Sequence, residues 1–190
     1  NVAKSAGNAT TARKLGGAPT WYETNVDAGA GGSGAGNGAI RTDGTQRAFT
    51  EDQLKGILVS CYNEGGNPNM IMVNAFNKQK LSGFTGGSTR FDAAEDRRLI
   101  TSIDVYESDF GTMQVSPNRF IRGANATAAK IGQDAHILDM EYWAVSFVRD
   151  FALQTPAQTA DADQRFMVAE YTLESRNEKA SGLITDLTTS

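Results

Sequence analysis

Residues Phe49–Phe84 carry the signals that most constrain how this chain of 190 residues can fold. Thr50 and Gln53 have the spacing of a capping box, in which each side chain hydrogen-bonds to the backbone amide of the other residue. Five apolar residues then recur at helical spacing and form one stripe: Leu54, Ile57, Leu58, Cys61 and Tyr62. Gly65 or Gly66 can take the left-handed conformation that ends a helix. The pattern predicts an amphipathic helix whose stripe is buried in a core.

A short apolar segment, Met70–Val73, follows the helix and shows no alternation of apolar and polar residues. Such a segment is typical of a strand that is covered on both faces. The residues before it, Gly66–Asn69, favour a turn. We therefore predict that helix and strand together begin a mixed core, and that Asn74–Phe84 continues it as a second short segment.

Strands are predicted to dominate the second half of the chain. Ile103–Tyr106 and Met113–Ser116 each alternate apolar and polar residues, and Ser108–Gly111 between them favours a hairpin turn. Pro117 is expected to end the second of these strands. Gly123–Asp134 is predicted to be a polar connecting loop.

Two further strands are predicted nearer the C-terminus. Trp143, Val145 and Phe147 lie on one aromatic-rich face of the first. The second, Arg165–Ser175, carries an apolar face formed by Met167, Ala169, Tyr171 and Leu173. Leu183–Ile184 can pair as a last short strand. Helices before residue 85 and strands after residue 100 indicate the α+β class.

The composition limits the possible functions of the chain. Its 18 Lys and Arg against 22 Asp and Glu give a net charge of −4, which argues against a surface built to bind phosphate groups. No apolar run is long enough to span a membrane, and no basic-then-apolar leader opens the chain. Cys61 is the only cysteine, and its position on the helical stripe predicts a buried side chain. The glycine-rich stretch Asp27–Gly38 predicts a flexible loop that a neighbour in an assembly could order.

Two patterns resemble binding sites but have simpler interpretations. Three glycines have the spacing of a dinucleotide-binding fingerprint: Gly29, Gly31 and Gly34. No helical pattern follows them, so a flexible loop is the better interpretation. Trp143 and Tyr142 could form a stacking platform for a sugar or a base, but the strand alternation favours core packing of Trp143 and Phe147.

His136 is the only histidine and therefore the only candidate imidazole base. It could join Asp134 and Asp139 in an acid–base or metal site, but no Gly-x-Ser-x-Gly nucleophile motif accompanies it and the spacing enforces no metal geometry. We predict an exposed histidine in a loop. The sequence thus predicts no catalytic, cofactor-binding or metal-binding residue.

Several blocks of residues, taken in chain order, point to one known family. They are Thr45–Leu54, Gly66–Lys80, Val105–Gly111, Pro117–Phe120, Glu141–Val145 and Glu170–Glu178. Together they resemble, in the same order, the major capsid proteins of tailed bacteriophages. The resemblance extends from about Thr11 to Leu187, and its most distinctive block is the last.

The resemblance implies the α+β Hong Kong 97-like phage capsid fold. Residues 1–44 would be the end of the spine region and a glycine-rich connecting loop of the peripheral domain. Residues 45–151 would form the axial domain, a mixed sheet flanked by helices, and residues 152–190 would return to the peripheral sheet. By the same resemblance, the N-terminal arm, the extended loop and most of the spine helix of that fold are expected to be absent from these residues.

By the same resemblance, the expected function is structural: self-assembly into hexamers and pentamers of an icosahedral phage head that encloses double-stranded DNA. The expected partners are copies of the chain itself, with scaffold, portal and decoration proteins; DNA is contacted only non-specifically, and no membrane is involved. No enzymatic activity and no cofactor are expected, and the expected location is the virion, assembled in the bacterial host cytoplasm. The polar side of the predicted helix, with Lys55 and Glu64, is a candidate for contacts between subunits. Two alternatives stay open: a virion decoration or carbohydrate-binding module that uses Trp143 and Tyr142, and a small α+β hydrolase that uses His136.

Overall fold

The computed structural model describes residues 2–84, 104–121, 131–157 and 161–189. Within these ranges the helices are α1 (Glu51–Asn63) and α2 (Ala75–Ser82), with short 3-10 turns η1 (Ala18–Thr20), η2 (Ile131–Gln133), η3 (Met140–Tyr142) and η4 (Glu178–Ala180). The strands are β1 (Val26–Asp27), β2 (Met70–Val73), β3 (Val105–Ser108), β4 (Gly111–Pro117), β5 (Ala135–Leu138), β6 (Trp143–Gln154), β7 (Phe166–Ser175) and β8 (Gly182–Ile184). The predicted α+β class is confirmed.

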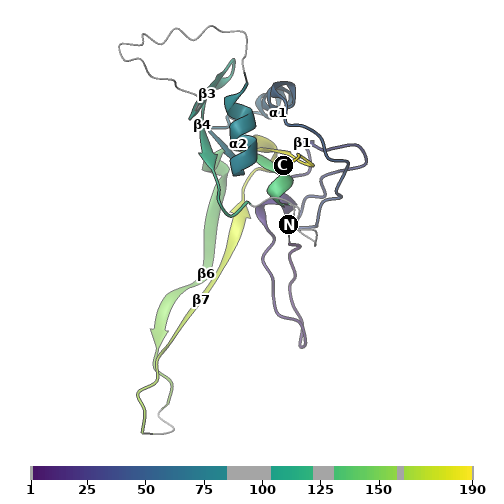
Figure 1. Cartoon of the computed structure of the whole chain (residues 1–190). Helices are drawn as coiled ribbons and strands as arrows, with labels where there is room; N and C mark the ends of the chain where they lie inside the picture. The colour runs from purple at the N-terminus through teal and green to yellow at the C-terminus, as the bar shows by residue number, and fades with distance from the viewer. Residues whose placement is uncertain (1, 85–103, 122–130, 158–160, 190) are drawn as a thin grey trace, which may run out of the picture.

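A six-stranded mixed sheet in the order β1-β8-β5-β2-β4-β3 forms the centre of the body (Figure 1). β2 is parallel to β4 and antiparallel to β5, while β8 is antiparallel to β5 and parallel to β1. The predicted last short strand is thus confirmed as β8. Its place between β1 and β5 brings the end of the chain back beside its beginning.

The local sequence predicts both ends of α1 correctly. The Thr50 hydroxyl accepts a hydrogen bond from the Gln53 amide at 3.4 Å, and the Gln53 side chain accepts one from the Thr50 amide at 3.1 Å. At the other end Gly65 has a φ of +83°, a left-handed conformation that glycine adopts without strain. The Gly66 amide donates to the Cys61 carbonyl at 2.9 Å, which closes the helix in a Schellman motif.

The apolar stripe of α1 packs into the core with one exception. Four of its members are buried as predicted: Leu54, Ile57, Leu58 and Cys61. Tyr62 is 59% exposed, so its predicted burial is wrong. It lies at the edge of the stripe, and its ring packs beside that of Phe110 in the β3–β4 turn, with the ring centroids 4.8 Å apart.

Replacing Thr50 with alanine is expected to lower the free energy of unfolding by about 1 kcal/mol, because the Gln53 amide loses its capping acceptor. Chemical denaturation of the two proteins measures the difference. Thr50→Ser keeps the hydroxyl and serves as the control, with an expected stability close to that of the original protein. Equal losses for both variants would contradict the role of the cap.

β2 is covered on both faces, which confirms the prediction from its unbroken apolar sequence. Ile71 and Val73 are fully buried in the larger core cluster, to which α1 and α2 also contribute side chains. Met70 and Met72 belong to the opposite face, where they pack against a smaller cluster that contains Tyr22. The sheet therefore separates two apolar layers.

The hairpin predicted from alternation is confirmed as β3 and β4, whose antiparallel pairing runs from Val105 opposite Gln114 to Ser108 opposite Gly111. β4 ends at Pro117, as predicted. Ile103 and most of the predicted loop Gly123–Asp134 lie outside the described residues. The last residues of that loop form η2 and lead into β5.

The glycine-rich loop (residues 28–45) is held by residues of its own chain, whereas the sequence favoured a flexible loop ordered by a neighbour. Ser33 and Thr42 pair across it through two backbone hydrogen bonds of 3.0 Å. A Cβ atom at Gly29 would clash with the carbonyl oxygen of Thr45, so the loop backbone packs too closely for any other residue there. Arg41 anchors the loop in the interior and is only 3% exposed.

Candidate assembly surface

β6 and β7 form a two-stranded antiparallel hairpin that is separate from the six-stranded sheet. The hairpin extends from the body as a long arm (Figure 1). Strands rise by about 3.4 Å per residue, so the 12 residues of β6 span roughly 40 Å. The two strands predicted near the C-terminus are thereby confirmed, and β6 continues well beyond the predicted segment.

The pairing register gives this hairpin one apolar face. Three directly opposed pairs place apolar side chains on it: Val145 with Leu173, Phe147 with Tyr171, and Leu153 with Met167. Phe151 joins the same face, because its ring lies 6.0 Å from that of Phe147. The opposite face is mixed: it carries the polar pairs Ser146 with Thr172 and Arg149 with Glu170, and farther out the apolar pair Ala152 with Val168. The apolar face predicted for β7 is confirmed by this register.

Most of the apolar face is open to solvent. Six of its side chains are between 49% and 65% exposed: Val145, Phe147, Phe151, Leu153, Met167 and Tyr171. The predicted core packing of Phe147 is therefore wrong, because the strand that carries it leaves the body. An isolated two-stranded hairpin is only marginally stable in water, and a contiguous exposed apolar surface usually marks an interaction site.

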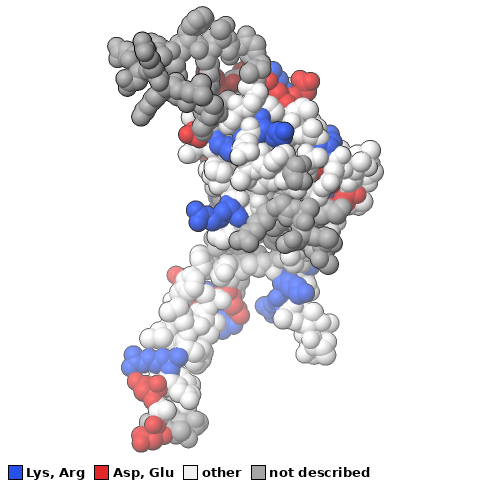
Figure 2. Space-filling model, viewed as in Figure 1, with Lys and Arg blue, Asp and Glu red and all other residues white. Residues whose placement is uncertain are grey.

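Charged side chains lie along the arm, both near the body and toward the free end, as Figure 2 shows. Arg149 donates two hydrogen bonds to Glu170, at 2.9 and 2.6 Å, on the polar face. Arg165 pairs with Asp163 at 3.1 Å near the tip. Exposed ion pairs of this kind add little stability, so they do not make the arm stable on its own.

Two irregularities shift the register within β6, one between Phe147 and Arg149 and one between Arg149 and Ala152. Each inserts one extra residue opposite β7. Val148 is the extra residue of the first shift and is 79% exposed. Bulges increase the local twist and redirect side chains. Simple alternation of apolar and polar residues contains no signal for such bulges.

Trp143 and Ser181 fix the base of the hairpin to the body. The Trp143 indole nitrogen donates to the Ser181 hydroxyl oxygen at 3.0 Å, and the same oxygen accepts a hydrogen bond from the Asp139 amide at 3.1 Å. The Trp143 ring packs against Tyr22 on the second face of the sheet, with the centroids 5.7 Å apart. The predicted core packing of Trp143 is confirmed by these contacts.

Ser181→Ala is expected to lower the free energy of unfolding by about 1–3 kcal/mol, because the indole and amide donors both lose a shared acceptor at a buried site. Chemical denaturation, followed by tryptophan fluorescence, measures the loss. An unchanged transition midpoint would contradict the anchoring role of this hydroxyl.

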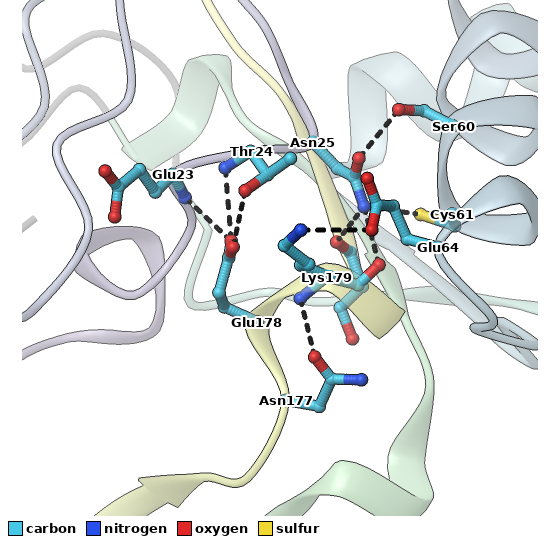
Figure 3. Close-up of polar contacts among 10 residues, drawn as sticks. Glu23, Thr24, Asn25, Ser60, Cys61, Glu64, Asn177, Glu178 and Lys179 are labelled. Atoms are coloured by element: carbon cyan, nitrogen blue, oxygen red, sulfur yellow. Dashed lines mark hydrogen bonds and ion pairs between the residues drawn. The ribbon is translucent and has the colours of Figure 1, made fainter.

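Glu178 ties the segment after β7 to the chain before β1 (Figure 3). One of its carboxylate oxygens accepts hydrogen bonds from the backbone amides of Glu23 and Thr24, each at 3.1 Å. The other oxygen accepts from the Thr24 hydroxyl at 2.5 Å. A single side chain therefore satisfies two backbone donors that precede a short edge strand.

Asn25 completes this junction from the opposite side (Figure 3). Its buried amide group donates to the Lys179 carbonyl at 2.6 Å and accepts from the Ser60 hydroxyl of α1 at 2.7 Å. Lys179 also pairs with Glu64 at 3.0 Å. Glu64, a candidate for contacts between subunits, is thus engaged within its own chain. The hairpin leaves the body from a junction braced by α1, η4 and β1.

His136 is buried in β5, so its predicted place in an exposed loop is wrong. Its Nδ1 lies 3.4 Å from the Tyr22 hydroxyl, and burial lowers the pKa of the imidazole to about 4. The two carboxylates considered as its partners are engaged elsewhere. Asp134 binds Arg41 at 2.8 Å, and Asp139 accepts hydrogen bonds from two backbone amides. These contacts serve the packing of the fold.

The other residues that the sequence suggested as a binding site also have a structural explanation. The three glycines of the fingerprint pattern lie in the glycine-rich loop, and the next helix, α1, begins only at Glu51. Across the described ranges, no group of three or more His, Cys, Asp or Glu residues is placed to hold a metal ion. None of the helices described is long and apolar enough to cross a membrane.

No curated protein matches the chain. A family model described as SU10 major capsid protein matches residues 1–188, almost the whole chain, and confirms the resemblance to phage major capsid proteins. The chain therefore belongs to the SU10 major capsid protein family.

Proposed function

We propose that this phage major capsid protein assembles with copies of itself into the hexamers and pentamers of an icosahedral head that encloses double-stranded DNA. The observation that supports this best is the uncovered apolar face of the β6–β7 hairpin, which gains stability only when another surface covers it. Symmetric assembly repeats each contact at every subunit, so a modest interface is sufficient to stabilise a closed shell.

The proposal includes the Hong Kong 97-like architecture. The body, with its mixed sheet and two helices, corresponds to the axial domain, and the hairpin corresponds to part of the peripheral domain. The proposed divisions are residues 1–44, 45–151 and 152–190. Two strands of the mixed sheet, β1 and β8, come from the first and third of these ranges, and β6 runs across the second boundary. Scaffold, portal and decoration proteins are proposed partners during assembly in the host cytoplasm.

A structural role accounts for the residues that first suggested other functions. His136, Asp134 and Asp139 are buried among packing and hydrogen-bonding contacts, and Trp143 anchors the hairpin. The net charge of −4 supports a shell that contacts enclosed DNA without specific phosphate sites.

Negative-stain microscopy and sedimentation of the full-length protein, expressed alone and with its scaffold, test the proposal. We expect closed shells or capsomers of uniform size. Uniform monomers under every assembly condition would contradict it.

A further inference from the structure

Arg41 lies at the centre of a buried ion cluster that joins three parts of the chain. Its side chain is 1% exposed, and its guanidinium lies 2.8 Å from Asp134, 3.2 Å from Asp186 and 2.8 Å from Asp43. Asp134 directly precedes β5 and Asp186 follows β8, whereas Arg41 and Asp43 belong to the glycine-rich loop. The cluster is therefore a charged contact between that loop and the central sheet.

The two buried carboxylates of this cluster have unequal surroundings. Asp186 accepts hydrogen bonds from four groups: the amides of Gly29 and Gly44, the hydroxyl of Thr185 and the guanidinium of Arg41. Burial alone would raise the pKa of Asp186, but these donors lower it. Asp134 is held by Arg41 alone at one oxygen, and no described residue hydrogen-bonds to its other oxygen, which is buried. An unpaired buried carboxylate oxygen favours the neutral form of the acid.

We propose that Asp134 is a proton-dependent latch that holds the glycine-rich loop against the sheet. With Asp134 protonated, the charge of Arg41 is balanced within the interior by the ionised Asp186. Loss of the proton adds a second buried negative charge beside one arginine and weakens the attachment of the loop. The loop is accordingly held more tightly at mildly acidic pH than at neutral pH.

The groups that face Asp134 support this direction. Burial raises the pKa of the Asp134 carboxyl to about 7, and Arg41 opposes that shift only in part. Burial also raises the pKa of the Tyr22 phenol and lowers the pKa of His136 to about 4, so both rings are neutral while Asp134 titrates. Because the pKa of Asp134 is raised in the closed structure, its stabilising effect is complete below the ordinary aspartate pKa of about 4. The effect is lost as the pH rises through about 7.

Hydrogen–deuterium exchange of the full-length protein tests the latch. The loop amides to follow are those held by hydrogen bonds: Gly29, Ser33, Thr42 and Thr45. After correction for the intrinsic exchange rate, we expect their protection to fall by about tenfold or more between about pH 5 and about pH 7.5, since one coupled proton changes an equilibrium by up to about tenfold per pH unit. Amides within β2 and β5 serve as internal references and should keep their protection.

Asp134→Asn removes the titrating group while keeping the side-chain shape, and it should abolish the pH dependence. Asp43→Asn makes the same change at a partly exposed carboxylate on the same arginine, and it should preserve the dependence. Protection in the original protein that does not fall with pH, or an equal fall in Asp134→Asn, would overturn the proposal. If Asp134→Asn does not fold, carbon-13 NMR of labelled aspartate in the original protein decides the matter. A carboxyl at position 134 that stays ionised down to about pH 5 would contradict the latch.

Discussion

Leu54→Ala is expected to lower the free energy of unfolding by about 2–5 kcal/mol. Leu54 is completely buried near the start of α1 and belongs to the same core cluster as Ile71 of β2. The alanine variant loses the transfer free energy of the removed carbon atoms and leaves a cavity between α1 and the sheet. Urea denaturation, followed by circular dichroism, measures the change in the transition.

Val59→Ala is the matched control for this prediction. Val59 lies on the same helix but is 43% exposed, so its truncation should change the free energy of unfolding by less than about 0.5 kcal/mol. A loss below about 1 kcal/mol for Leu54→Ala would show that the stripe does not form the centre of the core. Similar losses for the two variants would lead to the same conclusion.

The parts of the fold that sequence reasoning predicts well depend on neighbouring residues. The capping box at Thr50 and the glycine closure at Gly65 act within one or two helical turns, and both are present in the structure. The unbroken apolar run of β2 also identified a strand covered on both faces. In each case the necessary interaction is encoded by residue types at fixed short spacing.

The ion cluster could not be predicted in the same way, because its members are brought together by the sheet. Arg41 and Asp186 are 145 positions apart in sequence, and Arg41 and Asp134 are 93 apart. His136 was misplaced for a related reason. The sequence around a single polar residue with apolar neighbours does not show whether the folded interior holds a hydrogen-bonding partner for it, as the Tyr22 hydroxyl is for His136.

The β6–β7 hairpin, which forms the candidate assembly surface, could be predicted only in part from sequence patterns. Alternation in Arg165–Ser175 correctly identified which side chains share a face, since period two follows from strand geometry. It did not reveal that Phe147 is exposed, because an apolar stripe has the same pattern whether its own chain or another surface covers it. The two bulges of β6 add a change of register that alternation cannot encode.

Phe147→Ser is expected to prevent or strongly weaken shell assembly while leaving the subunit folded. Phe147 lies on the exposed apolar face, where its ring contacts those of Phe151 and Tyr171. Truncating a large aromatic side chain at a desolvated interface typically costs about 2–4 kcal/mol of binding free energy. The protein concentration at which shells form should therefore rise by at least about tenfold. Sedimentation and microscopy across a concentration series measure this threshold.

Phe166→Ser separates the role of the apolar face from a general effect of removing an aromatic ring from the arm. Phe166 pairs with Gln154 on the opposite face of the same hairpin, and it is 44% exposed. Because the proposed contact uses the other face, Phe166→Ser should assemble close to the original threshold. The unfolding transition of the unassembled Phe147→Ser protein should change by less than about 1 kcal/mol, since the ring contributes little to the core. Normal assembly of Phe147→Ser, or equal failure of both variants, would show that the apolar face is not the surface on which assembly depends.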